Sequence, residues 1–232
     1  MPALNAIQMP YLYKNADHMW AVLDGEIGKD MLAQIEASGS GLVGLCWYDA
    51  GARSYYTTKK VASVADMKGL KIRMQNNAMM VDMTNVLGGT GVTGIGPNEV
   101  YSAIKQGTID GAENNWPTYQ NMGDYEAATY YVLDEHTRVP EVQLASPAVM
   151  EKLAALDESF PEVIRACARE SAQKERELWA RREADAEQNM RKLGICVTEL
   201  DEAEKARFRA AVQPMYDRFH SHADLIQRIR ES

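Results

Sequence analysis

Apolar and polar residues alternate over residues 69–75, with the period of two expected of a strand that has one buried face. A second strand is predicted over 108–112. The helical spacing of apolar residues predicts two short helices between these strands, over 76–87 and 99–106. The order strand, helix, helix, strand is typical of an α/β layer, in which ligands bind in a polar crevice at the strand ends.

The rest of the chain is also patterned. An apolar run between glycines at 42–48 predicts a strand buried on both faces, and apolar spacing over 17–38 predicts two short helices. Residues 120–133 are weakly helical in pattern, and the glycine-rich segment 88–96 is expected to be a loop. Residues 157–193 are rich in Ala, Glu, Arg and Gln, and about thirty helical residues would span on the order of 45 Å. We expect this long helix to cross between two lobes.

Composition narrows the function. The 232 residues are 46% hydrophobic and 25% charged, which is ordinary for a globular protein. The net charge of −8 argues against a nucleic-acid partner and against binding to an anionic membrane surface, because both favour basic patches. No apolar run approaches the ~20 residues of a membrane span. The first residues have no basic or apolar leader region, so we expect no export signal in the chain as written.

The sequence predicts no metal site, no cofactor and no catalytic residue. The three cysteines match no zinc spacing and no complete disulfide framework, and the four histidines form no H-E-x-x-H motif. Residues 89–94 satisfy G-x-G-x-x-G but follow a predicted helix, whereas a dinucleotide site requires a preceding strand. A nucleophile elbow (G-x-S-x-G) is absent from the sequence, and no cysteine neighbours a plausible base.

Arg73 is the first candidate for ligand binding. It lies between apolar strand positions, and a guanidinium is costly to bury unless it has a partner. A carboxylate matches its planar shape through two hydrogen bonds. Arg73 could instead pair with an internal acid or face solvent. Gln75 lies on the same polar side of the predicted strand and is a second candidate.

The end of the second strand supplies further candidates. The amides of Asn114 and Asn115 could bridge hydroxyls and carboxylates, and the indole of Trp116 could stack on a sugar face. The alternative is turn chemistry, because Asn is common where the chain reverses. Arg53 and Lys59 could add positive charge, although exposed basic side chains are usually only solvated.

Four segments then occur in a characteristic order. They are residues 66–73 (D-x-K-G-L-K-I-R), 87–88 (L-G), 99–114 (E-V-Y-x-A-I-x-Q-G-x-x-D-G-A-E-N) and 125–126 (Y-E). Their order and spacing resemble those of the solute-binding proteins of tripartite ATP-independent periplasmic (TRAP) transporters, the DctP type. The similarity covers nearly the whole chain, from residue 9 to the predicted long helix.

The resemblance implies a fold, a function and a site. The fold would be an α/β, type II periplasmic-binding fold with two lobes and a long helix that spans both. The protein would bind a small organic acid, either a sugar acid or a dicarboxylate, in the periplasm, dock to TRAP membrane subunits and catalyse no reaction. In this family the arginine that matches Arg73 clamps a carboxylate, assisted by the residue at Asn114, and basic residues near Arg53 and Lys59 often contribute. The segments 114–117 and 134–136, including Glu135, look like the branch that binds sugar acids such as uronates.

The chain departs from the family at its start. Members begin with a signal peptide and a strand-helix-strand portion of the first lobe, and this chain starts after both. We therefore expect residues 1–48 to form the remainder of an incomplete first lobe, residues 49–142 to form the second lobe, and residues 143–232 to return to the first.

Three alternatives remain open. If Met1 is the natural start, the chain would stay in the cytoplasm. The chain could be a truncated remnant that no longer binds a ligand and self-associates as a homo-oligomer through its exposed first-lobe edge. An enzyme that acts on a sugar acid is a further alternative.

Overall fold

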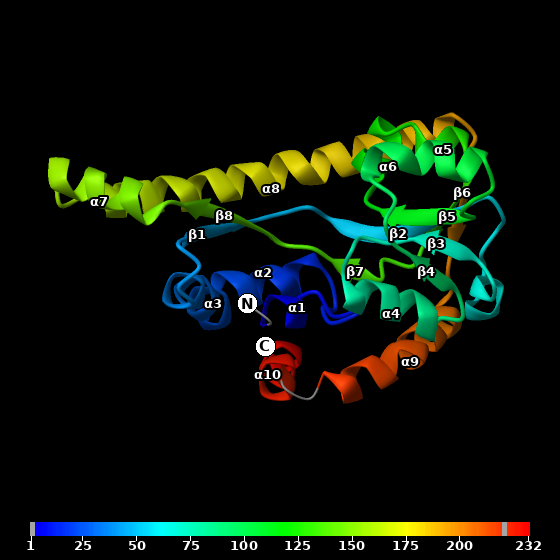
Figure 1. The fold of residues 1–232 in the computed structure, drawn as a ribbon, viewed down its shortest axis with the longest axis horizontal. Coiled ribbons are helices and arrows are strands. Elements are labelled where there is room, and N and C mark those ends of the chain that lie inside the picture. Colours follow the sequence, from blue (N-terminus) through cyan, green and yellow to red (C-terminus); the bar gives the residue numbers. More distant parts are fainter. Residues whose placement is uncertain (1–2, 220–221) are drawn as a thin grey trace.

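The chain folds into two β-sheets connected by crossing strands and by one long helix (Figure 1). The structure is a computed structural model, and it describes residues 3–219 and 222–232. The helices are α1 (Ala3–Ala6), α2 (Ala16–Asp24), α3 (Glu26–Ala37), η1 (Val64–Met67), α4 (Ala78–Val86), η2 (Pro97–Glu99), α5 (Val100–Lys105), α6 (Trp116–Asn121), η3 (Asp124–Glu126), α7 (Pro147–Leu156), α8 (Phe160–Lys192), α9 (Glu202–Arg218) and α10 (Ala223–Glu231). The strands are β1 (Val43–Tyr48), β2 (Ala52–Thr57), β3 (Lys71–Arg73), β4 (Thr90–Val92), β5 (Gly111–Asn114), β6 (Tyr130–Leu133), β7 (Thr137–Arg138), β8 (Glu141–Ala145) and β9 (Cys196–Glu199).

The larger sheet has the strand order β4-β3-β5-β2-β6-β9, and β7 pairs with the start of β2. Strand β3 runs parallel to both of its neighbours, whereas β2 is antiparallel to β5 and β6. One face of the sheet packs with α4 and α9, and the other packs with α5, α6 and the C-terminal part of α8. Both faces are therefore covered, which explains why Arg73 is buried although it lies opposite the apolar side of its strand.

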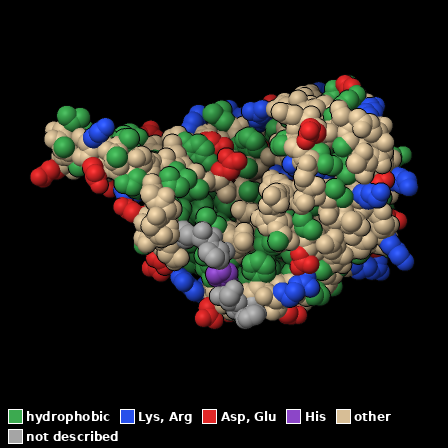
Figure 2. Space-filling view, in the orientation of Figure 1, with side chains coloured by type: hydrophobic (Ala, Val, Ile, Leu, Met, Phe, Trp, Pro, Cys, Tyr) green, Lys and Arg blue, Asp and Glu red, His purple; other side chains and the backbone are tan. Residues whose placement is uncertain are grey.

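The smaller sheet consists of β1 and β8 in antiparallel pairing. It packs against α3 and the first half of α8, through a small cluster that includes Val43, Met150 and Ala168. Large apolar side chains remain exposed on β8, α7 and the start of α8: Leu144, Val149, Leu156, Phe160 and Val163. Figure 2 shows hydrophobic side chains on this projecting end of the molecule.

The predicted long helix is confirmed as α8, which has 33 residues. Its Ala168 and Ala172 pack on the smaller sheet, and its Ala186 and Met190 pack in the core of the larger one. The helix therefore crosses between the two sheets, as its length predicts. Although α8 is long, neither it nor any other helix in the described ranges is apolar enough to cross a membrane.

Two local predictions are wrong. The segment 120–133 is not one weak helix, because α6 ends at Asn121 and β6 follows as a strand that pairs with β2 and, in parallel, with β9. The glycine-rich segment 88–96 is not only a loop, because β4 lies within it and pairs with β3. Both strands depend on partners distant in sequence. In β4, Gly91 allows close packing against α4, because a Cβ atom there would lie 3.0 Å from Val81.

Candidate functional site

Arg53 lies at the centre of a buried ionic network. Its Nε and Nη2 donate to the two carboxylate oxygens of Glu113, at 2.5 and 2.8 Å, and its Nη1 donates to Oδ1 of Asn114 at 2.9 Å. His136 continues the network, with Nε2 3.4 Å from Glu113 and Nδ1 2.8 Å from Asp134. Two cations and two carboxylates thus form one chain of contacts, and the guanidinium of Arg53 already has its carboxylate partner.

Strand pairing builds this network. Glu113 is opposite Tyr55 in the β2–β5 register, and Arg53 lies two residues from Tyr55 on the same face of the sheet. The ring of Tyr55 packs against His136 with centroids 4.4 Å apart. The two-residue period therefore places Arg53 and Glu113 on one face, and the contact with Tyr55 brings His136 to the same face.

The network shifts the pKa values of its members strongly. Burial alone would raise the pKa of Glu113, but Arg53 and His136 outweigh it and lower that pKa to about 2. Burial would lower the pKa of His136, but Asp134 and Glu113 raise it to about 9. At neutral pH the network therefore holds Arg53 and His136 charged against two carboxylates, with no net charge.

Arg73 is buried without such a partner. Its side chain is 8% exposed, and among the described residues it makes one hydrogen bond, from Nε to the carbonyl oxygen of Ile95 at 3.0 Å. Arg73 is paired in register with Ala112 of β5, so its side chain shares a sheet face with Asn114, two residues further on. The terminal nitrogens of Arg73 and Nδ2 of Asn114 have no acceptor in the described part of the chain. The arrangement can therefore bind a carboxylate.

Asn115 and Trp116 have partners within the protein. The Oδ1 of Asn115 accepts from the backbone N–H of Thr118 and caps α6, and its Nδ2 donates to the carbonyl oxygen of Ala50 at 2.9 Å. Trp116 is 7% exposed and stacks on Tyr131, with centroids 3.6 Å apart and 14° between the planes. The cap and the aromatic stack account for both residues structurally.

The other predicted residues lie at different places. Lys59 is exposed beyond the far end of β2, roughly 20 Å from Arg53 along the strand, so the structure does not bring these two residues together. Gln75 is exposed just past the end of β3. Glu135 has a φ of 42° and its backbone N–H donates to Oγ of Ser54 at 3.1 Å, while its carboxylate lies 3.8 Å from Arg138.

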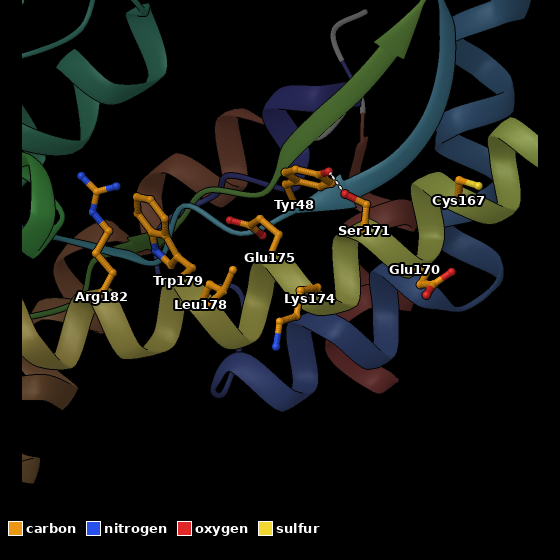
Figure 3. Close-up of a pocket in the computed structure, with 9 residues that line it drawn as sticks. All are labelled: Tyr48, Cys167, Glu170, Ser171, Lys174, Glu175, Leu178, Trp179 and Arg182. Carbon is orange, nitrogen blue, oxygen red and sulfur yellow. Dashed lines mark hydrogen bonds between the residues drawn. The ribbon is translucent and has the colours of Figure 1, made fainter.

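Two hollows have neither Arg73 nor Asn114 in their lining. The larger, about 1070 Å³, includes Trp116 and Glu135 in its lining. The smaller, about 640 Å³, runs along α8 beside Tyr48, whose hydroxyl lies 2.5 Å from Oγ of Ser171 (Figure 3). The predicted ligand residues are absent from the lining of this second hollow.

Sequence reasoning missed Glu113 and His136. The signal for Glu113 was a carboxylate within the strand Gly111–Asn114. Its side chain points to the face opposite Ala112, which packs in the apolar core. The contact of His136 with Asp134, two residues away, is local, but its contact with Glu113 had no local signal, because that contact depends on how β6 and β5 are arranged in the sheet.

A scan against protein-family models matches residues 1–222 to the DctP family, bacterial extracellular solute-binding protein family 7. The chain belongs to this family. The family and the relatives matched to this chain are solute-binding proteins and not enzymes, as the sequence predicts. A solute-binding protein of Chromohalobacter salexigens is 38% identical over 230 residues, which cover 97% of this chain. The alignment covers 65% of that relative, so the chain spans just under two thirds of its length.

Solved structures of TRAP periplasmic solute-binding proteins share the α/β fold, which confirms the predicted fold class. One from Xanthobacter autotrophicus, with bound β-D-galacturonate, is 40% identical, has a TM-score of 0.89, and is matched by 100% of this chain over 76% of its own. A protein from Citrobacter koseri was solved both in an apo, open form and with bound D-glucuronate. Each form is 33% identical with a TM-score of 0.88, and is matched by 98% of this chain over 74% of its own.

Proposed function

We propose that this protein is the binding component of a TRAP transporter for a sugar acid of the uronate class. The terminal nitrogens of Arg73 and the amide nitrogen of Asn114 bind the carboxylate of the ligand. The protein works outside the cytoplasm and delivers the acid to the membrane subunits of the transporter.

One observation carries the proposal. The larger sheet carries two buried arginines, Arg53 on β2 and Arg73 on β3. Arg53 has Glu113 as its partner, whereas Arg73 has no carboxylate partner among the described residues. A buried and unpaired guanidinium is costly, and an anionic ligand would offset that cost. Relatives solved with galacturonate or glucuronate support a uronate as that ligand.

The other predicted residues have secondary roles in the proposal. Arg53 holds Oδ1 of Asn114, which leaves the amide nitrogen free for the ligand. Gln75 and Glu135 lie on the rim, and Trp116 supports the wall through Tyr131. Lys59 is too distant to take part.

Domain closure fits the architecture. The chain crosses between the two sheets at residues 49–51 and 139–140, and α8 runs beside both crossings. A relative solved in an open form and with a bound uronate supports a closing motion. Closure would shift a two-state equilibrium by as much as the ligand prefers the closed form.

Calorimetry with galacturonate and glucuronate tests the proposal. Arg73→Met is expected to weaken binding about 100-fold, because a charge-assisted pair is lost, and Asn114→Ala about tenfold. Arg181→Met, a change of the same type at an exposed position of α8, is the control and should bind as the unaltered chain does. Failure of the unaltered chain to bind either acid, or undiminished binding by Arg73→Met, would contradict the proposal.

A second candidate is self-association through the smaller sheet. The exposed apolar side chains of β8, α7 and the start of α8 favour it, because such surface is usually covered by a partner. Sedimentation of the chain over a range of concentrations tests this candidate. A monomer that binds a uronate would exclude it.

A further inference from the structure

Asp124 is a buried carboxylate with an unused oxygen. The residue is 2% exposed, and its Oδ2 accepts a hydrogen bond from the hydroxyl of Tyr56 at 2.6 Å. Its Oδ1 is buried and has no partner in the described part of the structure. Such an atom is costly to bury, so its position calls for a reason beyond packing.

Strand register places this carboxylate on the side of the sheet that carries Arg73. Ala112 is paired with Tyr56 on one side and with Arg73 on the other, so all three side chains point to the same face. Burial raises the pKa of Asp124 above its usual value, and the hydrogen bond from Tyr56 and the positive charge of Arg73 offset only part of that rise. Asp124 thus lies within the field of Arg73, although the two form no ion pair.

The charges around the site allow a simple count. Arg53 and His136 are balanced by Glu113 and Asp134. Arg73 is the one buried arginine of the described residues without a carboxylate partner. A ligand at Arg73 would therefore meet one unpaired cation, with the carboxylate of Asp124 on the same side of the sheet.

We propose that Asp124 is a specificity-determining residue that restricts the Arg73 site to acids with one carboxylate. This inference rests on the proposed function and deepens it, because the sequence left sugar acids and dicarboxylates open. A uronate brings one negative charge, which Arg73 can balance. A dicarboxylate of the same carbon number brings a second charge, which meets Asp124 and no free cation.

The expected size of the effect follows from Coulomb's law. If the ligand carboxylate and the carboxylate of Asp124 lie on the order of 8 Å apart in a partly solvated site, their repulsion changes an equilibrium by on the order of fivefold. Removal of the Asp124 charge should therefore tighten the binding of a uronate by about fivefold. It should tighten the binding of a dianion by more, because both carboxylates lose the repulsion.

The experiment compares galacturonate with galactarate, the six-carbon acid that carries a second carboxylate, in calorimetric titrations of the 232-residue chain. The unaltered chain should prefer galacturonate. In Asp124→Asn both acids should bind more tightly, and the ratio of the two affinities should move toward galactarate by about twofold or more. Tyr56→Phe should move the ratio in the same direction by less. The hydroxyl of Tyr56 stabilises the charged form of Asp124, so its loss raises the pKa of that carboxyl and favours the neutral form.

Asp82→Asn is the matched control. It removes the same charge from α4, on the other side of the sheet, and should leave both affinities unchanged. If Asp124→Asn changes the two affinities by the same factor, or weakens both, the inference is overturned and the proposed function stands. If the unaltered chain binds neither acid, the proposed function fails, and this inference fails with it.

Discussion

Arg53 and Arg73 lie on strands of the same sheet and are buried to almost the same extent, at 6% and 8% exposure. Their surroundings are opposite. Arg53 donates to both oxygens of Glu113 and to Asn114, whereas Arg73 donates to one carbonyl oxygen. Burial alone therefore does not distinguish a structural arginine from one available to a ligand. The number of unused donors does.

The largest expected effect is on the Arg53 side. Glu113→Gln keeps the shape of the side chain but leaves Arg53 and His136 without their shared carboxylate, and should lower the free energy of unfolding by about 3–5 kcal/mol. Urea denaturation at pH 7 measures it. Glu162→Gln is the control, because it breaks an exposed pair with Arg169 and should cost less than about 1 kcal/mol. Equal costs for the two variants would show that the buried network is not a stabilising unit.

The next effect is the dependence of stability on pH. The pKa of His136 is raised from 6.5 to about 9, so its contribution is complete below pH 6.5 and is lost as the pH rises through 9. At about 1.4 kcal/mol per pH unit, the loss is at most about 3.5 kcal/mol. The pKa of Glu113, lowered from 4.5 to about 2, places its own loss on the acid side, between these values.

Denaturation at a series of pH values checks this dependence. The unaltered chain should lose stability between pH 6.5 and 9, and His136→Asn should show a flatter profile over that interval although it is less stable throughout. If both proteins have the same slope, His136 is not held protonated by its neighbours.

The smallest effect is expected on the Arg73 side. Arg73→Met removes a buried charge that has no carboxylate partner and loses one hydrogen bond, while it keeps most of the apolar stem. The free energy of unfolding should change by no more than about 1 kcal/mol, measured by the same urea denaturation. A cost close to that of Glu113→Gln would mean that Arg73, like Arg53, is a structural residue.

The sequence alone determined the elements with strong local signals. The alternation around Arg73, the apolar run that became β1 and the uninterrupted helical pattern of α8 each predicted an element that the structure contains. Side-chain period and helix propensity are properties of neighbouring residues, so they can be read without the fold. The ordered segments around Arg73 and Asn114 identified the family through the order and spacing of their residues, which are also properties of the sequence.

The tertiary structure decided what pairs with what. From the sequence, Arg73 was the first candidate to bind a carboxylate, with Asn114 beside it, and Arg53, Lys59 and Asn115 were further candidates whose partners no local pattern revealed. The pairing of β2 with β5 gave Arg53 its partner in Glu113, and the extended path of β2 placed Lys59 beyond its far end. The start of α6 used the amide of Asn115 as its cap. An ion pair between residues sixty positions apart depends on sheet register, which no local pattern encodes.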